Sequence, residues 1–417
     1  MRIIILSIIS SLFIISFSNA QNSSVYSRYG IGDVEYGYSP MMLSIGDLGI
    51  TRLDPDHIIV SNPASWSALS KTRIELSLGY KGISISDNSD QYFTSETDFK
   101  GFTFGFPVSH EYGIGVVTGL VPFSRVSYKS VKNFTSADAD IPSYKVTYEG
   151  KGGISKLFLG SSVYLPFGFV TGATLDYYFG NLRYYSNIEF DNTSDNINTD
   201  YENDHRTTGF GSTIGLISPN LAPKINIDLL SDLRLGLSVN YIAKLNTDTL
   251  LTATSSTQID TVTISTDKKM KLPLRINGGI SFVLNDSYHI NLDYSYQPWS
   301  NFEFDGISNS YLQDASKFTA GFEYTPKKSR NMSLLEQMTW RGGVSFEKTQ
   351  YQFNGNGINQ FSVFGGFSFP MDVDNLIDLG IQYSIRGTSD NSLLKEEFVK
   401  LYFGISFGEL WFLTYDK

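Results

Sequence analysis

The stretch from residue 398 to residue 412 reads FVKLYFGISFGELWF. Apolar residues alternate in it with polar, small or amphipathic ones, which is the period of a β-strand with one apolar and one wet face. Trp411 and Phe412 follow where an aromatic girdle would meet a membrane surface. A soluble antiparallel sheet alternates in the same way, so the recurrence of the pattern decides between the two folds. The apolar set is Val399, Leu401, Phe403, Ile405 and Phe407.

The N-terminus has the pattern of a secretory signal peptide. Met1-Arg2 is followed by the apolar run Ile3–Phe17 and by the small-x-small site Ser18-Asn19-Ala20. At about 15 residues the run is short for a membrane-spanning helix, which needs ~20. We therefore predict cleavage after Ala20. The chain has no Cys, which excludes a lipid-modified cysteine at the cleavage site and any disulfide framework.

The composition after the signal peptide is typical of a transmembrane β-barrel. No other long apolar run is present, yet aromatic residues make up 14% of the chain, with 26 Tyr and 30 Phe, and there are 37 Gly. Charged residues make up only 18%, below the ~25% of ordinary soluble domains. A net charge of −10 without a basic patch argues against nucleic-acid binding. We expect a multi-pass protein of the bacterial outer membrane in contact with its lipid.

The alternation recurs in fourteen candidate strands, beginning at Thr72. The expected fold is all-β, an antiparallel fourteen-stranded transmembrane barrel over residues 72–417. An even number of strands places both termini at the periplasmic side. The strands are predicted near 72–84, 97–107, 111–127, 154–165, 168–190, 206–217, 232–245, 271–284, 287–302, 315–325, 338–350, 358–369, 376–387 and 397–412.

Long polar connections separate many of these strands, and short turns separate others, as in barrels with extracellular loops and periplasmic turns. We expect long loops at 85–96, 128–153, 191–205, 246–270, 303–314 and 388–396. Tyr144–Tyr148 is open to two interpretations: a further short strand, or an extension of the strand near 154–165.

Charged residues fall on the face of each strand opposite the apolar one. A charge facing lipid at mid-depth costs ~2–4 kcal/mol, so the charged face is expected to line the lumen. These charges then form either a mutually paired, hydrated lining or a selectivity filter. The predicted lumen-lining residues are Arg73, Glu75, Arg234, Arg275, His289, Asp293, Glu323, Arg341, Glu347 and Arg386.

The segment from residue 21 to 71 shows no strand pattern and is too long for a simple leader. In a barrel, such a segment either hangs free or folds into the lumen as a plug. Asn62-Pro63-Ala64 stands near its end. Since Pro restricts the residue before it and Asn favours turns, this tripeptide predicts a tight bend, either in the lumen or as an ordinary turn into the first strand.

The mature chain resembles the FadL/TodX-like family of outer-membrane transport proteins, in the form found in Bacteroidetes. The resemblance is carried by Ser61-Asn62-Pro63-Ala64, by the strand count and by the stretch Leu120–Tyr128. It implies that residues 21–71 form an N-terminal hatch containing Asn62, Pro63 and Ala64. It also implies passive uptake of hydrophobic small molecules, such as long-chain fatty-acid-like or aromatic compounds.

A second function of a different class stays open. Within the resembling group, some barrels are accessory or plug subunits of outer-membrane complexes such as the type IX secretion machinery, which implies an envelope protein as partner. An enzyme is not expected, because the chain has no Gly-x-Ser-x-Gly elbow, P-loop or dinucleotide fingerprint. The four His residues lack metal-ligand spacing. We therefore predict no catalytic residue, no metal and no cofactor.

Overall fold

The computed structural model describes residues 24–410, except 88–89, 136–141, 192–197, 256–258, 328–331, 334 and 391–392. The predicted signal peptide and the pair Trp411 and Phe412 lie outside the described residues. Among the helices that are described, none has the length and hydropathy needed to cross a membrane.

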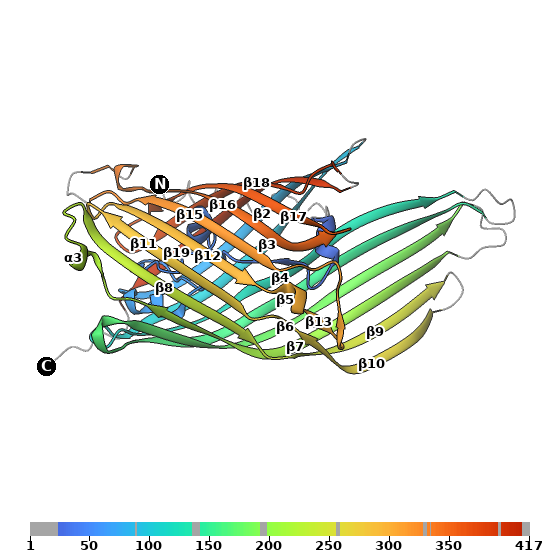
Figure 1. The fold of residues 1–417 in the computed structure, drawn as a ribbon, viewed down its shortest axis with the longest axis horizontal. Helices are drawn as coiled ribbons and strands as arrows, with labels where there is room; N and C mark the ends of the chain where they lie inside the picture. The colour runs from blue at the N-terminus through green and yellow to red at the C-terminus, as the bar shows by residue number, and fades with distance from the viewer. Residues whose placement is uncertain are drawn as a thin grey trace.

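The chain forms a closed, fourteen-stranded antiparallel β-barrel, which confirms the predicted fold (Figure 1). β19 closes the barrel by pairing with β2 from Lys395–Ser86 to Glu409–Thr72. Two wall strands are each built from two successive pieces. The wall strands are β2 (Thr72–Ser86), β3 (Gln91–Ser109), β4 (Ile114–Phe134), β5 (Tyr144–Tyr164), β6 (Val170–Phe190), β7 (Thr199–Ile217), β8 with β9 (Leu230–Ile242, Leu245–Ser255), β10 with β11 (Ile259–Lys271, Arg275–Leu284), β12 (Tyr288–Gln297), β15 (Ala315–Tyr324), β16 (Thr339–Phe353), β17 (Asn356–Pro370), β18 (Leu376–Arg386) and β19 (Lys395–Glu409).

The alternation in the sequence separates the outer surface of the wall from its lumen surface. In β18, Leu379, Ile381 and Tyr383 are 38–47% exposed on the outer surface, as lipid-facing residues must be. Their neighbours Gln382 and Ser384 are at most 1% exposed, on the lumen side. β19, which contains most of the stretch 398–412, shows the same alternation of exposed and buried side chains.

The predicted long loops at 85–96, 128–153, 191–205 and 246–270 are wrong over much of their length. β4 and β5 continue through most of 128–153, so Tyr144–Tyr148 is part of β5. β9 and β10 form a hairpin within 246–270. The polar composition misled the prediction because a strand that lies beyond the bilayer meets water, not lipid, and carries no apolar stripe.

These extensions form a sheet that projects from one end of the barrel (Figure 1). The projecting sheet has the strand order β4-β5-β6-β7-β9-β10. β4, β5 and β6 have 21 residues each, about twice the 9–11 residues that a barrel strand needs to cross a bilayer. The projecting end is the one opposite Thr72 and Glu409, where the wall begins and ends.

Residues 24–71, here called the inner segment, lie inside the barrel (Figure 1). Met41, Met42, Leu43 and Ile45 are 0% exposed, because they pack inside the wall and not against solvent. The segment contains η1 (Val25–Arg28), β1 (Asp33–Val34), α2 (Pro40–Ser44) and η2 (Pro63–Ala68).

α2 begins at a capped N-terminus and rests directly on the wall. The Ser39 hydroxyl accepts a hydrogen bond from the backbone N–H of Met42 at 3.3 Å, and Pro40 occupies the first turn, where its missing N–H costs nothing. Glycine makes the close approach possible, since a Cβ at Gly380 would lie 2.8 Å from the Pro40 carbonyl oxygen. A Cβ at Gly321 would collide with the carbonyl of Ile45.

Candidate functional site

The tripeptide Asn62-Pro63-Ala64 forms the start of η2 and lies against the wall. The side chain of Asn62 is fully buried; its Oδ1 accepts from the Ala64 N–H at 3.1 Å, and its Nδ2 donates to the Ile50 carbonyl at 2.7 Å. A Cβ at Gly172 of β6 would lie 2.5 Å from Pro63. The tight bend predicted for this tripeptide is therefore present in the lumen, while its role as a hatch stays a prediction.

A cluster of six charged side chains joins the inner segment to the wall. Arg52 Nη2 lies 2.6 Å from Glu323, which also accepts from Arg341 Nε at 2.6 Å. His57 bridges two carboxylates, Asp54 and Asp378, each at 3.2 Å. Three members come from the inner segment and three from the wall, and the cluster is electrically balanced when His57 is protonated. We call these six residues the charged cluster: Arg52, Asp54, His57, Glu323, Arg341 and Asp378.

The protonation of His57 follows from its neighbours. Burial disfavours the charged imidazolium, but the carboxylates of Asp378 and Asp54 outweigh burial and hold the pKa of His57 well above its usual range. His57 is 5% exposed, so water screens this attraction poorly.

Further ion pairs attach the inner segment to other parts of the wall. They distribute the attachment around the barrel, because their wall partners lie on three different strands. The pairs are Asp47–Lys317 of β15 at 2.8 Å, Glu35–Lys100 of β3 at 3.0 Å and Asp33–Arg386 of β18 at 3.0 Å.

The predicted lumen-lining residues include several that touch the inner segment. Arg73 pairs with Asp56, and Glu75 accepts from the backbone N–H of Ile58 at 3.0 Å. Asp293 accepts from the N–H groups of Gly49 and Ile50 at 3.0 and 3.2 Å. Glu323 and Arg386 make the ion pairs with the inner segment described above. Arg341 is linked to the inner segment indirectly, because it shares the carboxylate of Glu323 with Arg52.

Among the four remaining predicted residues, Arg275 also contacts the inner segment. Arg275 lies beside the ring of Tyr36 at 5.0 Å. Glu347 is buried. Arg234 pairs at 2.9 Å with Asp232 of its own strand, and His289 is only partly buried. The predicted set is therefore brought together in part, around the charged cluster.

No pattern in the sequence identifies the inner-segment partners of the wall charges. Arg52, Asp54 and His57 stand in a stretch without periodicity, so no pattern indicates which of its charges face the wall. Lys156 and Lys100 were missed for a different reason. Lys156 lies in an expected strand whose charges were not assigned to a face, and Lys100 lies at a β-bulge opposite Ser77 and Leu78, which shifts the strand period.

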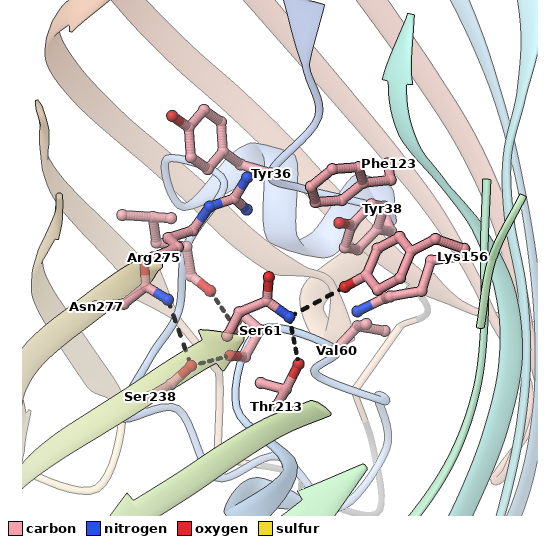
Figure 2. Close-up of a pocket in the computed structure, with 13 residues that line it drawn as sticks. Tyr36, Tyr38, Val60, Ser61, Phe123, Lys156, Thr213, Ser238, Arg275 and Asn277 are labelled. Atoms are coloured by element: carbon pink, nitrogen blue, oxygen red, sulfur yellow. Dashed lines mark hydrogen bonds between the residues drawn. The ribbon is translucent and has the colours of Figure 1, made fainter. Parts of the chain in front are cut away.

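Two small cavities lie between the inner segment and the wall. The first, about 30 Å³, is lined on one side by Arg275 beside Tyr36 and on the opposite side by Lys156 beside Tyr38 (Figure 2). The second, about 10 Å³, lies beside Met42. Among the described residues, no group of three or more His, Asp or Glu side chains is placed to hold a metal ion. The arrangement is suited to holding the inner segment in place by charge.

A family model covers nearly the whole chain. The BamG model matches residues 1–416. The chain belongs to the BamG family. No curated protein matches the sequence of this BamG-family chain.

Solved structures confirm the FadL/TodX-like resemblance at the level of the fold. The Pseudomonas aeruginosa FadL homologue has a TM-score of 0.63 at 11% identity, over 91% of the BamG-family chain and 99% of its own. The Ralstonia pickettii toluene transporter TbuX has a TM-score of 0.58 at 14% identity, over 89% and 98%. The Pseudomonas putida toluene transporter TodX has 0.56 at 16%, over 92% and 100%. The BamG-family chain thus has the fold of outer-membrane transporter barrels.

The charged cluster predicts a strong effect of Glu323→Gln. This change leaves Arg52 and Arg341 buried without their shared carboxylate, which typically costs about 3–5 kcal/mol. We expect faster protease cleavage of the inner segment in urea, measured on the purified barrel. The matched control is Glu303→Gln, which removes a solvent-accessible partner of Lys271 and should leave the cleavage rate unchanged. Equal rates for the two variants would contradict the assigned role of the cluster.

His57 predicts a pH-dependent attachment. Because its pKa is raised in the folded protein, its stabilisation is complete below the unfolded value of about 6.5 and is lost as pH rises through the folded value. The Tm difference between wild type and His57→Gln should therefore shrink from pH 6 upward. Thermal unfolding between about pH 5 and 10 measures it, with His110→Gln as the control. A difference that grows with pH would refute this assignment.

Proposed function

We propose that this barrel works in the outer membrane as a docking subunit of a protein assembly of the envelope. The observation that carries the proposal is the projecting sheet, which extends from one end of the barrel (Figure 1) and whose strands β4, β5 and β6 are about twice as long as a bilayer requires. With both termini in the periplasm, the projecting sheet stands outside the cell. The inner segment acts as a plug that keeps the barrel closed while the projecting sheet binds the partner.

One edge of the projecting sheet is suited to strand addition. From Tyr128 to Phe134, β4 pairs with β5 on one side, and no described residue forms a β-ladder with its other side. An open edge presents unpaired N–H and C=O groups that a partner strand can bind. The opposite edge, β10, is interrupted by two register shifts, which protect an edge from pairing. We therefore assign docking to β4.

The charge of the β4 edge indicates the partner. Lys129 and Lys132 are exposed on it, and such lysines discourage pairing with a second basic strand. An extended acidic segment satisfies both the backbone groups and the two ammonium groups. We infer a partner that contributes such a segment.

The small size of the two cavities in the lumen supports docking of a protein over passage of small molecules through the barrel. The two cavities described above measure about 30 and 10 Å³, whereas a buried cavity that binds benzene measures ~150 Å³ and ligand pockets ~300–1,000 Å³. A single aromatic ring does not fit either cavity without movement of the inner segment, which several buried ion pairs oppose.

The test is Val131→Pro. Ser127 directs its N–H and C=O toward the inner segment, as its bonds to Ser27 and Ser24 show. Every second residue of a strand directs its backbone N–H and C=O to the same side. Val131 is four residues after Ser127, so its N–H lies on the side of β4 away from β5, which is the open edge. Proline there removes a donor without breaking the ladder with β5. We expect loss of the protein partner in a mild-detergent pull-down from the native membrane.

Val131→Thr keeps the N–H and is the matched control for that pull-down. It should retain the partner. Two results would contradict the docking assignment. One is full recovery of a stoichiometric partner with Val131→Pro, and the other is recovery of no partner with wild type.

Passive uptake of hydrophobic small molecules is the second candidate. It is favoured by the fold shared with toluene transporters and by the rings of Tyr36, Tyr38, Phe123 and Tyr178 around the first cavity. It requires the inner segment to shift and widen that cavity. This candidate predicts that the purified barrel binds toluene or a long-chain fatty acid saturably in equilibrium dialysis. Binding that rises linearly with concentration, as partition into detergent does, would remove this candidate and leave docking standing.

A further inference from the structure

The first cavity has two cationic side chains in its lining and no carboxylate. Lys156 comes from β5 and Arg275 from β11, and they face the cavity from different sides (Figure 2). About 30 Å³ is room for two water molecules or one small ion, since a single water needs ~10–15 Å³. The charge of the lining therefore determines which occupant is stable.

Lys156 lacks a counter-charge of its own. It is 5% exposed, and none of the described carboxylates lies within 4.0 Å of its Nζ. Its close contacts are the ring faces of Phe158 at 5.3 Å and Tyr38 at 5.9 Å. Ring faces offset only part of the cost of burying an ammonium group.

Arg275 is only partly satisfied. Its Nε donates to Gln297 Oε1 at 3.1 Å, and its guanidinium lies 5.0 Å from the ring of Tyr36 and 5.5 Å from that of Phe123. Its Nη2 is buried and has no acceptor among the described residues. A buried guanidinium N–H without an acceptor is costly, and a small anion in the cavity would satisfy it.

Of the nearby carboxylates, Asp176 has one buried oxygen, Oδ1, without a hydrogen-bond partner among the described residues, and two others lie near Lys317. Asp176 stands behind the lining, where its Oδ2 accepts from Tyr178, Thr213 and Asn240 at 3.3, 3.0 and 3.4 Å. Asp47 is 2.8 Å from Lys317, and Glu347 lies directly across the strand pair from Lys317. Asp176 offsets the charge of one cation of the cavity, and the group of the lining that still lacks an acceptor among the described residues is the Nη2 of Arg275.

We propose that this cavity binds one small monovalent anion, a halide or a short carboxylate, between Lys156 and Arg275. The anion bridges the wall to the inner segment, because Tyr36 and Tyr38 of the inner segment line the cavity together with the two cations. It is a structural ion, and the proposal is independent of the docking function. An anion as large as gluconate does not fit about 30 Å³.

The test compares chloride with gluconate on the full barrel at equal ionic strength. Binding to the folded state alone raises the Tm in proportion to the logarithm of the ligand concentration. We expect a rise of about 1–2 °C for each tenfold increase in chloride above its Kd, and none with gluconate. A crystal grown in bromide should show an anomalous peak between Lys156 and Arg275.

Lys156→Met should abolish the chloride effect. Lys151→Met, the same change at a more exposed lysine of the same strand that pairs with Glu149, is the matched control and should retain it. If Lys156→Met does not fold, the wild-type measurements decide alone. Equal Tm values in chloride and gluconate, or bromide bound only elsewhere, would overturn the proposal.

Discussion

The structure depends on the pairing of charges that the inner segment buries when it enters the barrel. A lumen lined with Glu323, Arg341 and Asp378 would be hydrated in an empty barrel. Once residues 24–71 occupy it, Glu323 is 1% exposed, and a buried charge without a partner costs several kcal/mol. The inner segment supplies the partners itself, through Arg52 and His57, so each of the two parts offsets buried charge of the other.

The wall contacts three environments, and each selects different side chains in the wall strands. Lipid demands the apolar outer stripe of strands such as β18. The filled lumen demands polar groups with partners, and glycine where the inner segment comes close, as at Gly321. Beyond the bilayer water wets both faces, so β9 and β10 carry a polar sequence and still form a hairpin.

The fold is shared with outer-membrane transporters of hydrophobic compounds. Many side chains in the lumen of this barrel, however, are charged, whereas a channel for apolar molecules requires an apolar lining. Around the inner segment the groups are charged and mostly paired, and the space left over is small. The first cavity is the exception to the pairing, since Lys156 and Arg275 face it without a carboxylate in the lining. Function on such a scaffold is decided by the contents of the barrel and by its projecting sheet, since the fold itself serves many uses.

The sequence by itself determined the barrel, because a strand that touches lipid on one face must alternate with period two. That constraint is local: it identified fourteen wall strands, and it assigned residues such as Arg73 and Glu323 to the lumen side. Only the tertiary structure decided which charges meet. Arg52 and Glu323 are 271 residues apart, and residues 24–71 carry no period that indicates which side chains face the wall. Most of the projecting sheet, apart from β6, was not predicted for the same reason, since water imposes no alternation on its strands.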